Sequence, residues 1–157
     1  MRVLAVDPGY DRLGVAVLEL ENGKEKLIFS TCVETDRSAP LPDRLLAIGN
    51  EIQVLFLTHT PDALAIETLF FNTNTNTALP VAGVRGIIIY LARARNCKVF
   101  EYSPQQIKVA VTGYGKSDKE AVTSMTKRLI PGIPEGKLDD EYDAIAIGIT
   151  CLAHNRH

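Results

Sequence analysis

Cysteine is scarce in this sequence of 157 residues, and its placement excludes two common kinds of scaffold. The three cysteines lie far apart in the chain, at Cys32, Cys97 and Cys151. An odd, widely spaced set disfavours a disulfide framework and a zinc ribbon. Histidine is equally scarce, and its three copies do not have the spacing of metal ligands. The chain also lacks the flanking motifs of a Ser/His or Cys/His nucleophile.

Long apolar runs are absent, since none approaches the roughly 18 residues that a membrane-spanning helix needs. The opening segment, MRVLAVDPGYDR, turns polar too soon to resemble a secretory signal. An apolar fraction of 46% and a charged fraction of 23% are ordinary for a folded domain and exclude global disorder. We therefore expect a soluble cytoplasmic protein, without a membrane contact, that folds as one domain over residues 1–157.

A large excess of one charge is also missing, and a net charge of −2 at first argues against a polyanionic partner. The charges are nevertheless unevenly distributed. From Arg85 to Arg128 the chain has nine basic residues against three acidic ones, or +6, which leaves eight basic against sixteen acidic elsewhere, or −8. This basic segment indicates phosphate binding, although a solvated helical face would show the same pattern.

Three strands are predicted at the start of the chain. Arg2–Val6 is a nearly continuous apolar run, which is typical of a central strand buried on both faces. Gly14–Leu20 and Glu25–Glu34 have strand patterns and are separated by Asn22-Gly23, the strongest short signal for a hairpin. We expect these strands to form an antiparallel meander.

Strands and helices alternate in the middle of the chain. Apolar residues recur at helical spacing from Leu41 to Leu55, and the short strand Asp62–Ile66 follows. Asn74–Arg95 is predicted as a long helix that is apolar nearly all round and so buries more than one face. A fifth strand is expected over residues 98–101.

The last third of the sequence is predicted to be helical. Ser103 before a proline is a typical start of a helix. Ser117 and Glu120 have the spacing of a capping box that would open a helix over Ser117–Leu129. The final helix runs from Asp139 to about residue 153. The order βββαβαβααα predicts an α/β domain with a mixed five-stranded sheet flanked by helices.

Two predicted strands end in an acidic residue. Asp7 follows the first strand directly, and Glu67 follows the fourth. If these strands are parallel neighbours, both carboxylates lie at the carboxyl edge of the sheet, where open α/β sheets bind ligands. Two such acids repel each other unless a cation or a proton lies between them.

The final helix contributes further acids. Asp140 and Asp143 are three residues apart and share a helical face. Simple capping of the helix dipole explains Asp139 or Asp140, but it explains Asp143 less well because an apolar run follows. From helix geometry alone, Asp139 is nearly as good a partner for Asp143 as Asp140 is.

The acids Asp7, Glu67, Asp140 and Asp143 would form an all-oxygen cluster, which selects Mg²⁺ or Mn²⁺ over zinc. A pair of such ions about 3.5–4 Å apart is the usual device for in-line phosphodiester displacement. The sequence therefore predicts a two-metal site for phosphodiester hydrolysis.

The chain resembles the RuvC family of crossover junction endodeoxyribonucleases, within the RNase H-like superfamily, from residue 1 to about residue 153. The resemblance rests on an ordered set of residues: Val3–Gly9, Ala65–Glu67, Phe70, Ala78-Leu79, Arg85-Gly86, Tyr102, Gln106, Lys108, Gly113–Gly115, Lys119 and Asp140–Ala144. It implies an RNase H-like fold and a homodimer that resolves four-way (Holliday) DNA junctions in recombination and repair. It further implies paired symmetric nicks, dependence on Mg²⁺ or Mn²⁺, and the RuvA–RuvB branch-migration complex as partner.

The resemblance also assigns roles to individual residues. It implies that Asp7, Glu67, Asp140 and Asp143 bind the metal ions. Lys108 and Lys119 match basic residues near the scissile phosphate, and Phe70 matches an aromatic that stacks on a base at the crossover, with core packing as its alternative. From the basic segment we add Arg85 and Lys116 as candidate DNA contacts. The apolar helix 74–95 is the candidate dimer interface, with burial against the sheet alone as the alternative.

Three other functions are compatible with parts of this pattern. Arg12–Val17 also resembles the first hairpin of YqgF-like nucleases, which act on other nucleic acids. An actin-like nucleotide-binding protein would need a second Asp-x-Gly hairpin in a second domain, and the length leaves no room for one. A junction-binding module without activity is not favoured while all four acids are present.

Overall fold

The computed structural model describes residues 1–69 and 75–156, and their order of elements confirms the predicted βββαβαβααα. The elements are β1 (Arg2–Asp7), β2 (Arg12–Glu21), β3 (Lys24–Glu34), α1 (Leu41–His59), β4 (Ala63–Glu67), α2 (Thr75–Arg93), β5 (Lys98–Tyr102), α3 (Pro104–Thr112), α4 (Lys119–Leu129) and α5 (Asp139–His154). None of the helices in the described part of the chain is long and apolar enough to cross a membrane.

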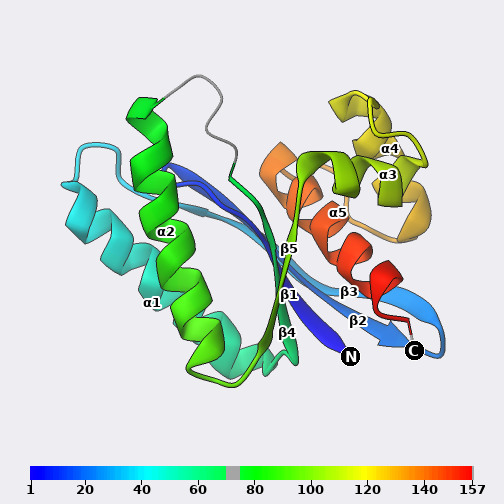
Figure 1. Cartoon of the computed structure of the whole chain (residues 1–157), viewed down its shortest axis with the longest axis horizontal. Coiled ribbons are helices and arrows are strands. Elements are labelled where there is room, and N and C mark those ends of the chain that lie inside the picture. Colours follow the sequence, from blue (N-terminus) through cyan, green and yellow to red (C-terminus); the bar gives the residue numbers. More distant parts are fainter. Residues whose placement is uncertain (70–74, 157) are drawn as a thin grey trace.

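The five strands form one mixed sheet in the order β3-β2-β1-β4-β5 (Figure 1). The first three strands pair antiparallel, and β4 and β5 continue the sheet parallel to β1. The β2–β3 turn uses Asn22 and Gly23, whose φ angles of 51° and 75° are those that a tight hairpin turn requires. The predicted α/β class and sheet arrangement are therefore confirmed.

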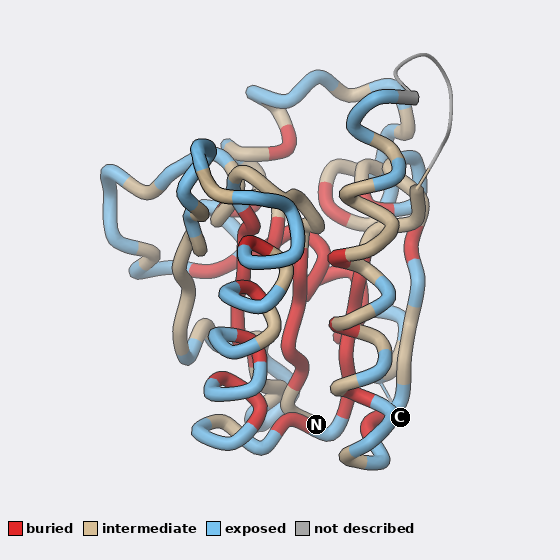
Figure 2. Tube along the Cα trace, turned by 90° about the vertical axis from the view of Figure 1, so that its left-hand side faces the viewer, coloured by how far each residue is buried: buried red, intermediate tan, exposed pale blue. Residues whose placement is uncertain are grey.

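Helices cover both faces of the sheet. Figure 1 shows α1 and α2 on one side and α3, α4 and α5 on the other. Alternate residues of β1 serve the two layers, because Leu4 and Val6 pack toward α1 and α2 while Val3 and Ala5 pack toward α5. The central strands are accordingly the most deeply buried part of the chain in Figure 2.

Small residues bring α5 close to the sheet. Ala5, Ala16, Ala63 and Ala65 are fully buried in the core cluster that includes α5. At Gly148 of α5, an added Cβ would overlap the side chain of Leu18 on β2. The axis of α5 therefore lies close to β1 and β2, which brings the acidic first turn of this helix to the end of β1.

Of the two N-caps predicted for α3 and α4, one is confirmed and one is wrong. Ser103 caps α3 as predicted, since its hydroxyl accepts a hydrogen bond from the Gln106 backbone N–H. The predicted capping box at Ser117 is wrong, because α4 begins at Lys119 and Asp118 is its cap, accepting from the Ala121 N–H. The Ser117 hydroxyl instead donates to the Tyr114 carbonyl, which closes the preceding turn.

Candidate active site

Asp7 and Glu67 lie side by side at the carboxyl edge of the sheet. Val6 is paired with Ile66 in the parallel β1–β4 ladder, and an acid follows each of them. The two strand ends therefore present adjacent carboxylates, as the sequence predicts.

A glycine brings the α5 acids to the same edge. Gly14 on β2 is paired with Asp7 on β1, and an added Cβ at Gly14 would overlap the backbone carbonyl of Asp140. Only a residue without a side chain allows the first turn of α5 to approach β2 so closely. Asp143 lies one helical turn further along α5 and lines a pocket together with Glu67.

Asp140, rather than Asp139, faces this site. The Asp140 side chain is 21% exposed, whereas that of Asp139 is 70% exposed. The Asp140 charge also contributes to the raised pKa of Asp7. The structure thus separates two residues that helix geometry alone left nearly equivalent.

Burial and mutual repulsion raise the pKa of the strand-end acids. Burial is the largest cause for Asp7, followed by the charges of Glu67, Asp143 and Asp140, and its pKa rises to about 8. Burial and then the Asp143 charge raise the pKa of Glu67 to about 7. Burial also raises the pKa of Asp143, although Lys119 opposes this effect. These acids therefore lack sufficient positive charge around them.

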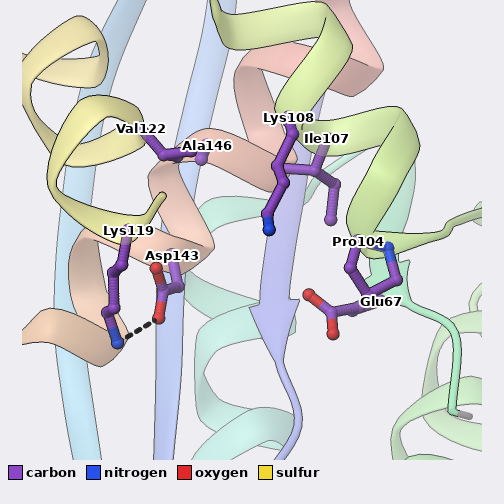
Figure 3. A pocket seen from close by; sticks show the side chains of 8 residues that line it. All are labelled: Glu67, Pro104, Ile107, Lys108, Lys119, Val122, Asp143 and Ala146. Atoms are coloured by element: carbon purple, nitrogen blue, oxygen red, sulfur yellow. Dashed lines mark ion pairs between the residues drawn. The ribbon is translucent and has the colours of Figure 1, made fainter. Parts of the chain in front are cut away.

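Among the described residues, Lys119 and Arg12 form ion pairs with the α5 acids of the cluster. Lys119 Nζ lies 3.0 Å from a carboxylate oxygen of Asp143, the contact drawn in Figure 3, and 3.7 Å from one of Asp139. Arg12 Nη2 lies 2.9 Å from Asp140 Oδ2. Asp7 and Glu67 have no ion pair through their carboxylates among the described residues.

The donor set suits a hard divalent cation, but its members do not yet surround one. Asp140 Oδ2 is buried and accepts no hydrogen bond from residues 1–69 or 75–156, and the four side chains offer only carboxylate oxygens. Within the described ranges, no three Asp, Glu, His or Cys side chains lie close enough together to hold an ion as they stand. The ligand assignment therefore stays a prediction, in which an ion would draw the repelling carboxylates together.

A pocket of about 200 Å³ opens between α3, α4 and α5 beside these acids (Figure 3). Its polar lining consists of Glu67, Asp143, Lys108 and Lys119, and Lys108 extends from α3 toward the space between the two acids. The remaining lining is mostly apolar, from Pro104, Ile107, Val122 and Ala146. The two lysines that the family resemblance implies near the scissile phosphate thus line the same pocket as Glu67 and Asp143.

The other predicted DNA contacts have different positions. Arg85 on α2 is mostly buried, donates through Nε to the Glu67 carbonyl at 3.2 Å, and pairs with Glu101 on β5. Arg85 therefore holds the end of β4 through the Glu67 backbone. Lys116 is exposed in the turn before α4. Phe70 lies outside the described residues, so the stacking role stays a prediction.

Arg12 is the site residue that sequence reasoning missed. Its signal was present, because Arg12 and Gly14 are two residues apart on one strand and so point to the same face of the sheet. That face is the one that α5 covers at Asp140. The pairing joins residues 128 positions apart, however, and only the packing of α5 against β2 reveals it.

The chain is similar to known proteins along almost its whole length. A family model described as crossover junction endodeoxyribonuclease RuvC matches residues 3–151. A curated relative of that name from Alkaliphilus metalliredigens is 39% identical over 157 residues, covering 100% of this chain and 95% of the relative.

Solved structures are similar over the same span. Thermus thermophilus RuvC matches with a TM-score of 0.91 at 28% identity, covering 99% of this chain and 96% of that one. T. thermophilus RuvC in complex with a Holliday junction substrate matches with a TM-score of 0.92 at 27% identity, covering 99% and 95%. The chain belongs to the crossover junction endodeoxyribonuclease RuvC family.

Proposed function

We propose that this chain resolves four-way DNA junctions by hydrolysing one phosphodiester bond in each of two strands, at the carboxylates of Asp7, Glu67, Asp140 and Asp143. The observation that carries the proposal is the gathering of these acids at one edge of the sheet, in a chain that matches the RuvC family along almost its whole length. The YqgF-like alternative has no comparable observation in its favour.

We propose Mg²⁺, with Mn²⁺ as a substitute, as the bound cation, and two ions in each site. The all-oxygen donor set supports this choice, as does the buried Asp140 Oδ2, which accepts no hydrogen bond from the described residues although it forms an ion pair with Arg12. Bound ions would activate the attacking water and stabilise the leaving 3′ oxygen. The carboxylates of Asp7 and Glu67 would hold these ions at the ends of their strands, where burial already raises the pKa of both acids.

Lys119 and Lys108 supply positive charge for the phosphate. Lys119 is the first residue of α4, where exposed backbone N–H groups already favour an anion. Lys108 reaches into the pocket from α3, and its charge lowers the pKa of Glu67. A phosphate drawn between these lysines would be held beside Glu67 and Asp143, with exposed Lys116 as an outer contact.

The assembly we propose is a homodimer through α2. The inner face of α2 packs into the core through Val84, Ile88 and Ala92. One face of this helix is therefore buried within the chain. Its outer face leaves Leu79 and Tyr90 exposed by 78% and 70%. A two-fold dimer would present two identical sites to a two-fold symmetric junction. We further propose that the dimer works in the cytoplasm with a RuvA–RuvB complex.

Incubation with three labelled substrates tests this function. In Mg²⁺, we expect symmetric nicks in a four-way junction and none in a linear duplex or an RNA–DNA hybrid. Asp7→Asn should abolish cleavage but retain junction binding, because Asp7 is proposed to hold a metal ion rather than to contact DNA. Unchanged cleavage by this variant would contradict the metal assignment. Cutting of the RNA–DNA hybrid alone would contradict the proposal that the substrate is a four-way junction.

A further inference from the structure

Arg12 brings a fixed positive charge to the acid cluster. It is the first residue of β2 and stands two residues before Gly14, the point of closest approach to α5. Its guanidinium Nη2 lies 2.9 Å from Asp140 Oδ2, and 44% of the Arg12 side chain remains exposed. The arginine can therefore leave the carboxylate without opening the core.

The contact between Arg12 and Asp140 is electrostatic rather than a well-formed hydrogen bond. Asp140 Oδ2 is buried, and no donor in the described part of the chain has the geometry of a hydrogen bond to it. A buried carboxylate oxygen without a directed donor retains much of its capacity to bind a cation. The Asp140 carboxylate therefore has a positive charge beside it, but its Oδ2 accepts no hydrogen bond from the described residues.

The four acids consequently fall into two pairs. Asp140 and Asp143 each have a basic partner, from β2 and α4 respectively. Asp7 and Glu67 have none through their carboxylates among residues 1–69 and 75–156, and burial is the main cause of their raised pKa values. At the strand-end pair a divalent ion has no ion pair to break among the described residues, although the Lys108 charge acts on Glu67. At Asp140 the ion must displace the Arg12 guanidinium or share the carboxylate with it.

We propose that Arg12 is a positioning residue that holds Asp140 and competes with a divalent ion for its carboxylate, so that the ion shared by Asp140 binds more weakly. The proposal rests on the proposed function in assuming that Asp140 is a metal ligand. When an ion takes Asp140, the exposed Arg12 side chain turns outward. Glu34, its exposed neighbour in the β2–β3 ladder, is then available as a partner.

Binding of Mn²⁺ to the DNA-free protein tests the inference without an activity assay. Electron paramagnetic resonance of free Mn²⁺ gives the dissociation constants of the parent chain and of Arg12→Gln. We expect Arg12→Gln to tighten the weaker Mn²⁺ binding by about three- to fivefold, the effect of removing a competing ion pair. Arg12→Lys retains a positive charge that can reach Asp140 and should restore binding close to that of the parent.

A double-mutant cycle separates the direct contact of Arg12 with Asp140 from the long-range effect of the Arg12 charge on the bound ion. If Arg12 acts through Asp140, Arg12→Gln should change Mn²⁺ binding by less than about 1.5-fold in an Asp140→Asn background. Arg156→Gln is the matched control, since it removes an arginine that pairs with Glu25 instead, and should leave Mn²⁺ binding unchanged. Circular dichroism of each variant confirms folding.

Each outcome decides the question. Unchanged or weakened Mn²⁺ binding in Arg12→Gln would overturn the inference, and so would an effect that persists in the Asp140→Asn background. If the parent chain binds Mn²⁺ and Arg12→Gln binds it equally well, only this inference fails. If the parent binds no Mn²⁺ at all, the metal-dependent function fails with it.

Discussion

Asp7 is an acid whose folded environment favours the proton over the charge. Its pKa of about 8 compares with an ordinary value of 3.8, and burial is the first cause. Between these two values the folded chain binds more protons than the unfolded chain. The free energy of unfolding of the metal-free protein must therefore fall as the pH rises from about 4 to about 8, and this contribution levels off above pH 8. Glu67 acts in the same direction up to about pH 7.

This linkage predicts that the metal-free protein loses stability as the pH rises, and that a bound metal ion offsets the loss. In a chelating buffer, thermal unfolding should show a loss of about 2–4 kcal/mol between pH 6 and pH 8.5. The pH dependence should be smaller in Asp7→Asn, since this variant removes the carboxylate with the largest penalty. Saturating Mg²⁺ should stabilise the parent chain more at pH 8.5 than at pH 6. A metal-free protein that grows more stable over this interval would contradict the assigned burial of Asp7.

At the scale of elements, the site depends on how closely α5 approaches β2. Gly14 faces the Asp140 carbonyl, and the backbone of α5 leaves no room for a side chain there. The acids of α5 reach the end of β1 because of this contact, which lies within a tightly packed core. Adding one methyl group at Gly14 should therefore lower the stability of the fold and shift the acids of the site.

Gly14→Ala tests this dependence. We expect it to lower the free energy of unfolding by about 1–3 kcal/mol, the usual cost of overpacking, and to weaken Mn²⁺ binding because Asp140 is pushed away from Asp7. Gly49→Ala in α1 is the matched control, since its Cβ would make only an ordinary contact with Ile87 at 3.4 Å. Equal stability and equal Mn²⁺ binding in the Gly14 and Gly49 variants would show that the approach of α5 is not limiting.

Local patterns predicted elements better than they predicted contacts between elements. The strand ends at Asp7 and Glu67 were visible because an apolar run stops abruptly at an acid. The cap of α4 was missed because Ser117 and Asp118 are adjacent and both can cap, and only the hydrogen bonds of the turn decide between them. The contact of Arg12 with Asp140 depends on helix packing, which no local periodicity records.

At the scale of the whole molecule, the two helix layers carry different proposed functions. The α3–α5 layer contributes the α5 acids and the pocket, and the α1–α2 layer carries the exposed apolar residues of α2 on the other face of the sheet. Arg85 of α2 donates a hydrogen bond to the carbonyl of Glu67 and so links the proposed dimer helix to the end of β4. A dimer formed through α2 would leave both active sites accessible to DNA.

Tyr90→Asp tests this assembly. The charge lies on the outer face of α2, so we expect a folded monomer and a loss of paired nicking. Leu57→Asp on α1 is the matched control, because Leu57 is similarly exposed but lies outside α2, and it should leave the dimer intact. Sedimentation equilibrium gives the masses, and a Tyr90→Asp protein that remains dimeric would exclude α2 as the interface.

The central claim is that four acids from β1, β4 and α5 converge on divalent ions. Anomalous diffraction from crystals of the parent chain soaked in Mn²⁺ tests it most directly. We predict Mn²⁺ peaks within bonding distance of carboxylate oxygens from Asp7 and from at least two of Glu67, Asp140 and Asp143. Crystals saturated with Mn²⁺ that show no peak at this edge of the sheet, or peaks only elsewhere on the protein, would contradict the account.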